Sequence, residues 1–404
     1  MSLVLSACMV LTLLPTVAFA AETTAELGDF SVTYDADGTP PTWNSSDQSL
    51  LFTAVGEYTV AMKSAITSTP DVIVVNAAGV TLNLNGVTIE APVGSSEAPD
   101  GANALTTING TVLNITADSS LTGGNGALID PMGDSNGNGG SGVVGNVSIT
   151  GAATLTVTGG IGGSAAMGIS GTGGAGISGD VAVTGAVTLT AIGGIGGTSV
   201  TGTSGTGGAG ISGNVAATDS ASLIAIGGQY GGGIANGGNG ISGSLTVTDH
   251  ATVSLEGGLS SSTPGSALTG TLTATSFTLK GGFTGLTDEI TSSDSRLNQF
   301  RYLSVEPLPN VAEIGSTGYP TLQAAVDAVA EGQTIKLLDN VTVTDSSSIT
   351  ISGSNSFTLD LNGKTLDGGS GSSSLIKHSG SGTLTIEDGG TGGKITSSRT
   401  ASDN

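Results

Sequence analysis

Acidic side chains are the most numerous groups in this chain that could do chemistry. Asp180, Asp219 and Asp249 could supply the paired carboxylates that a glycoside hydrolase needs. Each of them lies in a repeated pattern at a position where other copies have Asn, Ser or Gly. Those residue types are typical of turns, so we expect turn residues here. His250 and His378 lie in no Ser/His/Asp-like set, so the sequence predicts no catalytic residue.

A candidate metal site is the stretch DPMGDSNGNGG at residues 130–140. Oxygen-bearing side chains alternate there with glycines, which suits the oxygen ligands that Ca²⁺ prefers. The loop lacks the terminal Glu of an EF-hand, so a loop without metal is the competing interpretation. No other cofactor is expected. The candidate Ca²⁺ ligands are Asp130, Asp134, Asn136 and Asn138.

One loop carries the side chains best suited to contact a sugar. Aromatic rings offer large, rigid contact surfaces, but aromatic residues make up only 3% of this chain. Tyr230 stands in GGQYGGGIANGG, where a side chain is expected to face solvent. With the nearby carboxamides of Asn236 and Asn239, it is our candidate ligand-binding set. The competing interpretation is that Tyr230 packs on its own loop.

Charge and composition exclude several classes of protein. The 404 residues carry a net charge of −23, from 32 acidic and 9 basic residues. Nucleic acids and anionic membrane surfaces are bound through Lys and Arg, so neither is an expected partner. The 69 glycines show no Gly-X-Y period, which excludes collagen, while 37% hydrophobic residues are too many for a disordered chain.

The N-terminal segment MSLVLSACMVLTLLPTVAFA has the apolar core and small-residue end of a secretory signal peptide. We predict cleavage between Ala20 and Ala21. No Lys or Arg precedes the apolar core, and a lipoprotein modification at Cys8 is the alternative. A chain that begins at Ala21 contains no cysteine, so packing and backbone pairing must stabilise it. No membrane span is expected in it.

The elements that would position these side chains come from an internal repeat. Apolar and polar residues alternate within each copy, which is typical of β-strands. Stacked copies must share one core, because a single copy cannot bury its own apolar face. The predicted fold is therefore all-β, a right-handed parallel β-helix, with an antiparallel β-sandwich as the alternative. The copies, such as GNVSITGAATLTVTGG and GDVAVTGAVTLTAIGG, begin at Gly110, Gly145, Gly179, Gly213, Gly243 and Gly270.

Two blocks are predicted, because VTLNLNGVTIE at residues 80–90 is echoed by FTLDLNGKTLD at residues 357–367. Leu322, Ala325, Val326 and Val329 share one face of a short helix, with Thr321 as N-cap. We expect this helix to cover the end of the second stack, and that block to be truncated at Asn404. The expected segments are a signal peptide (1–20), a lead-in (21–55), a first β-helix (56–285), a connector (286–310) and a second β-helix (311–404) with its cap helix (321–331).

The sequence IVVNAAGVTLNLNGVTI, followed by Gly-rich AGISG loops, resembles secreted right-handed β-helix surface proteins of gut Firmicutes. Many of these are labelled carbohydrate-binding or pectate-lyase-like. The stretch from VAEIGSTGYPTLQAAVDAVAEG to GTLTIEDGG resembles another module of their large surface proteins. The resemblance implies an extracellular, cell-surface location and glycan binding. Pectate-lyase-type β-helices use Arg or Lys as the base, and residues 64–279 contain neither.

These observations together predict a secreted or cell-surface adhesin or stalk that contacts an extracellular polysaccharide or host glycan without catalysis. A polysaccharide lyase or glycoside hydrolase of the pectin-degrading type is one alternative. A purely structural spacer is the other. The chain is expected to be a monomeric piece of a larger surface protein.

Overall fold

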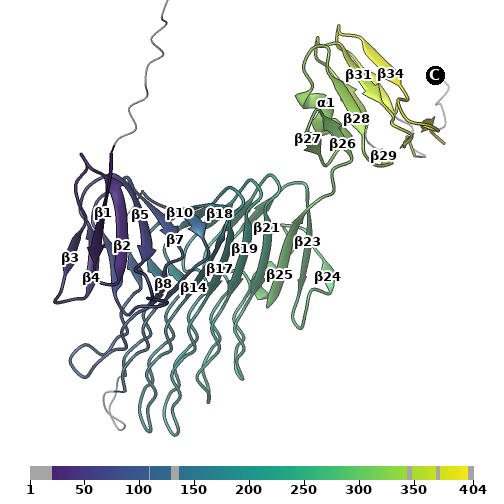
Figure 1. The fold of residues 1–404 in the computed structure, drawn as a ribbon. Coiled ribbons are helices and arrows are strands. Elements are labelled where there is room, and N and C mark those ends of the chain that lie inside the picture. Colours follow the sequence, from purple (N-terminus) through teal and green to yellow (C-terminus); the bar gives the residue numbers. More distant parts are fainter. Residues whose placement is uncertain (1–20, 109, 129–135, 344–347, 370–373, 399–404) are drawn as a thin grey trace, which may run out of the picture.

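A computed structural model of the chain describes residues 21–108, 110–128, 136–343, 348–369 and 374–398 (Figure 1). Nearly all of its regular structure is β-strand, as the alternating sequence predicts. Two separate hydrophobic cores are present, one within residues 27–305 and one within residues 312–384.

Three sheets surround the first core. The first sheet has ten strands, in the order β1 (Glu22–Leu27), β2 (Phe30–Asp35), β5 (Gly56–Met62), β7 (Val80–Asn85), β10 (Thr111–Ala117), β13 (Val147–Gly151), β16 (Val181–Val183), β18 (Val215–Ala217), β20 (Leu245–Val247) and β22 (Leu272–Ala274). The second has nine, in the order β8 (Thr88–Glu90), β11 (Ser119–Thr122), β14 (Thr154–Thr158), β17 (Thr188–Ile192), β19 (Ser222–Ile226), β21 (Thr252–Glu256), β25 (Tyr302–Pro307), β23 (Phe277–Gly282) and β24 (Asp288–Glu289). The third has six, in the order β3 (Thr42–Asn44), β4 (Ser49–Phe52), β6 (Val72–Val75), β9 (Leu105–Thr106), β12 (Val143–Val144) and β15 (Ile177–Ser178).

Each sequence repeat adds one parallel strand to the first sheet and one to the second. Val147 pairs with Val181, and Val181 with Val215, so equivalent residues of successive repeats form a column. These valines are at most 5% exposed. The third sheet continues in the same direction through single bridges at Ile211, Ile241 and Leu268. The predicted inward and outward faces of the repeat strands are confirmed.

Both ends of the first stack are closed by antiparallel strands. At one end the hairpin of β1 and β2 covers β5, and Phe30 and Phe52 of the predicted lead-in lie fully buried in the core. At the other end β25 runs antiparallel to β21 and β23. The predicted connector supplies this closure, with Phe300 fully buried after a short 3₁₀ helix, η1 (Leu297–Gln299). Both segments therefore belong to the first core.

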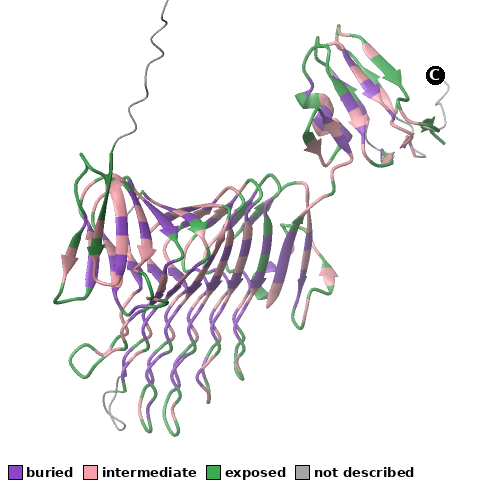
Figure 2. Cartoon of the chain, viewed as in Figure 1, coloured by how far each residue is buried: buried purple, intermediate pink, exposed green. Residues whose placement is uncertain are grey.

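Glycine-rich arms link the second sheet to the third and project from the stack as thin paired strands of backbone (Figure 1). The best-described arms comprise residues 159–176, 193–210, 227–240 and 257–267. Figure 2 shows that they are buried where they leave the sheets and exposed at their tips. Each arm has an outgoing and a returning segment, and the segments of successive arms lie in two layers. We call this array the arm plate.

Hydrogen bonds inside the arm plate recur at every third position of the chain. In the outgoing layer Gly159 and Gly162 donate to the Ile192 and Ile195 carbonyls of the next repeat, at 2.8 and 2.9 Å. Gly160 donates across the layers to Gly140 at 2.7 Å. A period of three without internal hydrogen bonds is the geometry of polyproline-II helices. The arm segments share this period and are held by hydrogen bonds to their neighbours.

The second core is built in the same way, because Thr334 pairs in parallel with Thr358, and Thr358 with Thr385. Its five-stranded sheet has the order β27 (Thr317–Tyr319), β26 (Ala312–Ile314), β28 (Thr334–Leu337), β31 (Phe357–Asp360) and β34 (Leu384–Glu387). The two smaller sheets contain β29 (Val341–Thr342), β32 (Thr365–Asp367) and β35 (Lys394–Thr396), and β30 (Ile349–Ile351) and β33 (Ile376–His378).

The predicted cap helix is present as α1 (Leu322–Ala328) and lies against the first strand of the smallest sheet. Thr321 caps it, since its hydroxyl accepts the Ala324 amide at 3.1 Å. Gln323 donates to the Thr350 carbonyl at 2.9 Å and accepts the Thr350 amide at 2.8 Å. This carboxamide occupies the edge of β30 as a neighbouring strand would, which protects the edge from other chains.

Candidate functional site

A shallow groove of about 500 Å³ crosses the outer face of the first sheet. Five neighbouring strands, β10, β13, β16, β18 and β20, contribute to it. It exists because the outward residues there are small. Ser148, Ala182, Ala216 and Thr246 follow one another in register across the strands, and Ala182 and Ala216 leave the floor low.

One border of the groove is a ladder of polar side chains, one from each of four successive repeats. The Asn146 carboxamide accepts the Asp180 amide at 2.8 Å, the Asp180 carboxylate accepts the Asn214 amide at 2.7 Å, and the Asn214 carboxamide accepts the Ser244 amide at 3.0 Å. Each side chain thus bonds the backbone of the next repeat. The ladder reinforces the backbone pairing, which spaces the strands about 4.8 Å apart, and presents polar atoms along the border from Asn146 to Ser244.

The groove combines an apolar floor with a border of hydrogen-bonding groups. Of its lining residues only Asp180 is ionisable, and one of its carboxylate oxygens already accepts two hydrogen bonds from Asn214. A set of this kind can donate and accept hydrogen bonds to hydroxyl groups. It offers a single carboxylate where paired-carboxylate hydrolysis needs two.

The structure places Asp219 and Asp249 in turns, as expected. Both have φ +57°, a left-handed conformation that Asp tolerates better than most residues. The Asp219 carboxylate accepts the Gly185 amide at 2.8 Å. His250 and His378 are exposed.

The predicted sugar-binding residues do not line the groove. Tyr230 is half-buried in the outgoing layer of the arm plate, where the preceding arms have Gly162 and Gly196. Asn236 is exposed on the returning layer, and the Asn239 carboxamide accepts the Ser266 amide at 2.9 Å. Asn239 thus bonds the neighbouring arm, while sugar contact by these residues stays a prediction.

The predicted Ca²⁺ loop is only partly described, because Asp130 and Asp134 lie outside the described residues. Asn136 is buried and donates to the Ile169 carbonyl at 3.3 Å. The Asn138 carboxamide oxygen accepts both the amide and the hydroxyl of Thr172 at 2.9 Å. Across the described part of the chain, no three His, Cys, Asp or Glu side chains gather as a metal site would require.

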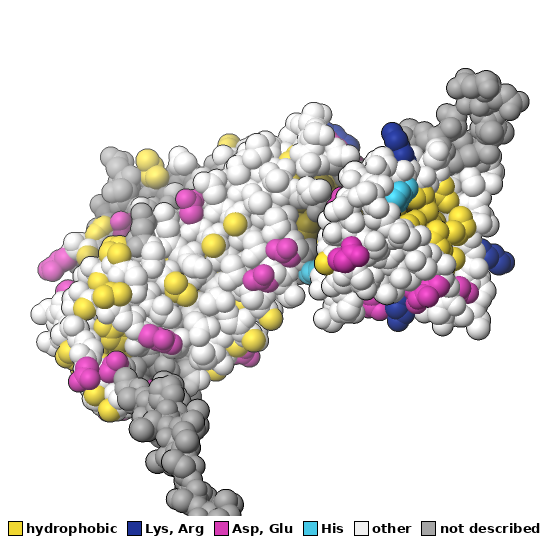
Figure 3. All heavy atoms as spheres, turned by 90° about the horizontal axis from the view of Figure 1, so that it is seen from above, with side chains coloured by type: hydrophobic (Ala, Val, Ile, Leu, Met, Phe, Trp, Pro, Cys, Tyr) yellow, Lys and Arg dark blue, Asp and Glu magenta, His cyan; other side chains and the backbone are white. Residues whose placement is uncertain are grey.

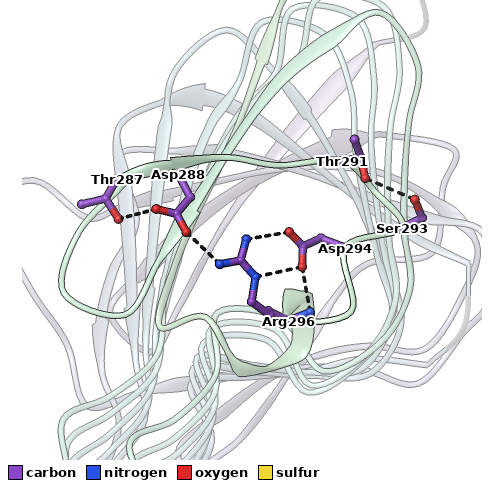
Figure 4. Close-up of polar contacts among 6 residues, drawn as sticks. All are labelled: Thr287, Asp288, Thr291, Ser293, Asp294 and Arg296. Carbon is purple, nitrogen blue, oxygen red and sulfur yellow. Dashed lines mark hydrogen bonds and ion pairs between the residues drawn. The ribbon is translucent and has the colours of Figure 1, made fainter.

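A second polar cluster lies in the closure after β23 (Figure 4). Arg296 contacts Asp288 at 3.0 Å and Asp294 at 2.9 Å, and its guanidinium lies 5.0 Å from the centre of the Phe300 ring. Hydrogen bonds from Arg296 lower the pKa of Asp294. Arg296 thus bridges two carboxylates and ties the closure loop together.

Sequence reasoning missed the groove, because its residues come from different repeats and none of them is chemically unusual. The face seen in Figure 3 likewise carries only scattered carboxylates among uncharged side chains over the first core. Comparison of the chain with protein-family models, characterised proteins and solved structures finds no match. No helix in the described ranges has the length and apolar character to cross a membrane.

Proposed function

We propose that this chain is a secreted or surface-displayed right-handed parallel β-helix that holds a linear, uncharged polysaccharide without turning it over. The observation that carries the proposal is the groove, which crosses five successive strands and is bordered by a polar side chain from each of four successive repeats. A repeating surface suits a repeating polymer, because each sugar unit can meet an equivalent set of hydrogen-bonding groups.

The strand arrangement supports the β-helix. Each repeat places one strand in each of two parallel sheets, and a third strand or bridge in another, before the next repeat begins. Parallel strands joined in this way form a coil whose turns stack along one axis. Right-handed connections are strongly preferred between parallel strands, which favours the right-handed form.

The charge pattern supports binding of a neutral polymer in preference to catalysis on an acidic one. Residues 64–279, which contain every groove residue, include no Lys or Arg that could pair with a uronate or act as a base. Asp180 and the net charge of −23 repel anionic chains.

Secretion is supported by the predicted signal peptide, whose apolar core ends in Ala18-Phe19-Ala20.

The test is a glycan array probed with the purified chain and two variants. Ala182→Phe fills the groove floor, whereas Ala186→Phe places the same ring on an exposed turn of the same repeat, outside the groove. We expect the wild type and Ala186→Phe to retain a neutral linear glycan and Ala182→Phe to lose it by at least about tenfold, or about 1.4 kcal/mol.

Three outcomes contradict the proposal. Release of unsaturated or reducing sugar ends would establish a lyase or a hydrolase. Equal retention of the glycan by both variants would show that it binds outside the groove, and Tyr230 would be the next candidate. A blank array would favour a spacer without ligand.

A further inference from the structure

Four consecutive arms of the arm plate form an extended surface of this acidic chain that carries no charge, whereas the segment 91–104 that bonds to the preceding arm includes Glu97 and Asp100. The four arms, residues 159–176, 193–210, 227–240 and 257–267, contain no Asp, Glu, Lys, Arg or His. The chain as a whole has a net charge of −23. Two copies that approach through carboxylate-bearing surfaces repel each other, whereas contact through these four arms brings no charges together.

The two layers of the arm plate differ in polarity. In the outgoing layer the third residue of the Gly-Gly-X pattern is apolar in three of the four arms, with Ile161, Ile195 and Leu259 exposed by 44%, 42% and 44%. They lie along one file, because Gly162 donates to the Ile195 carbonyl and Tyr230 to the Leu259 carbonyl. In the returning layer the matching residues, such as Thr172 and Thr206, are polar. They follow one another in neighbouring arms, because the Gly173 amide donates to the Thr206 carbonyl.

The tips of the arms extend the apolar surface. Met167, Ile169, Val200 and Ile234 are exposed by 44%, 53%, 83% and 84%. Soluble proteins rarely expose large contiguous apolar patches unless a partner covers them.

The plate is also rigid. A Cβ atom at Gly160, Gly174 or Gly194 would lie 1.9 to 2.0 Å from a backbone carbonyl oxygen of another segment. These glycines therefore hold the segments at a distance that no other residue allows. A surface fixed before contact loses little conformational entropy when it associates.

We propose that the outgoing layer of the arm plate is the contact surface between two copies of this chain. A two-fold arrangement would place the file of Ile161, Ile195 and Leu259 against the same file of the second copy. Each copy would cover the other's apolar side chains, and the carboxylates of both would stay in solvent. This contact differs from the monomer expected from the sequence.

The experiment is sedimentation equilibrium of the full chain and two variants. Ile195→Asp places a carboxylate in the apolar file, and Thr206→Asp places the same group on the returning layer of the same arm. Both positions are exposed, and neither side chain makes a hydrogen bond within the described structure, so both variants should fold. Far-ultraviolet circular dichroism checks that they do.

We expect the wild type and Thr206→Asp to dimerise alike, and Ile195→Asp to raise the dimer dissociation constant by at least about tenfold. Raising the salt concentration from about 20 mM to about 500 mM should strengthen the wild-type dimer, because salt screens the repulsion between two acidic chains.

A wild type that stays monomeric at high salt overturns the proposal, and so does equal weakening by both variants. Neutral phosphatidylcholine vesicles are sedimented with the chain as a second measurement. If the wild type is monomeric and sediments with the vesicles while Ile195→Asp does not, the surface contacts lipid and not a second copy.

Discussion

The arm plate makes one strong prediction, that a methyl group at a packed glycine will disrupt it. Gly194 lies in the outgoing layer, donates to the Gly174 carbonyl at 2.7 Å and accepts from the Gly208 amide at 2.8 Å. In Gly194→Ala the new Cβ would lie 1.9 Å from the Gly160 carbonyl oxygen. Ordinary contact needs about 3.4 Å, so neighbouring backbone must move by about 1.5 Å.

The expected cost has two parts. Forcing an extra carbon into a packed interior costs about 1–3 kcal/mol. A displacement of that size also breaks the two hydrogen bonds of Gly194, each worth about 1 kcal/mol. We expect Gly194→Ala to lower the free energy of unfolding by about 3–5 kcal/mol.

The matched control is Gly86→Ala in the turn after β7. Gly86 has φ +71°, but a Cβ there would meet nothing within 4 Å. The control therefore measures conformational strain alone, about 1–2 kcal/mol.

Urea unfolding followed by circular dichroism compares the midpoints of the wild type and both variants. Stacked repeats can open locally, so hydrogen exchange at the Gly208 amide is the second measurement. We expect faster exchange at Gly208 in Gly194→Ala only. If the two variants unfold at the same urea concentration and Gly208 stays protected, the glycines are turn residues and the close-packed arm plate is wrong.

Two further predictions concern the ends of the stacks. Gln323→Ala removes both hydrogen bonds between α1 and Thr350. We expect it to lower the free energy of unfolding by about 1–2 kcal/mol, measured by thermal unfolding, and to speed hydrogen exchange at the Thr350 amide. The control Thr321→Ala should leave that amide protected. At the other end, burial raises the pKa of Asp71, which accepts the Asp29 amide at 2.8 Å. Protonation of Asp71 thus favours the folded state below the ordinary aspartate pKa of about 3.9, and this contribution is lost as the pH rises through the folded value. Asp71→Asn keeps the acceptor oxygen but cannot ionise. The thermal midpoint of this variant minus that of the wild type should therefore increase from about pH 3 to about pH 7. A difference that stays constant over this range would refute the assignment.

The sequence by itself determined the strands, their inward faces and several of their turns. Alternation is a local property, so Val147, Val181 and Val215 could be assigned to one column from the order of the residues alone. Left-handed turn residues such as Asp219 and the N-cap Thr321 were predicted for the same reason, since each acts on its immediate neighbours in the chain.

Tertiary structure decided which residues far apart in the chain contact one another. Glycines that sequence patterns assign to loops form the arm plate, because many of them bond to a segment of the opposite layer or of a neighbouring arm. The period of three in GGIGGS was the one local sign of it. The groove likewise arises only when five strands align their small side chains. The segments predicted as lead-in and connector close the first core, because their apolar residues pack against the core at the open edges of its sheets.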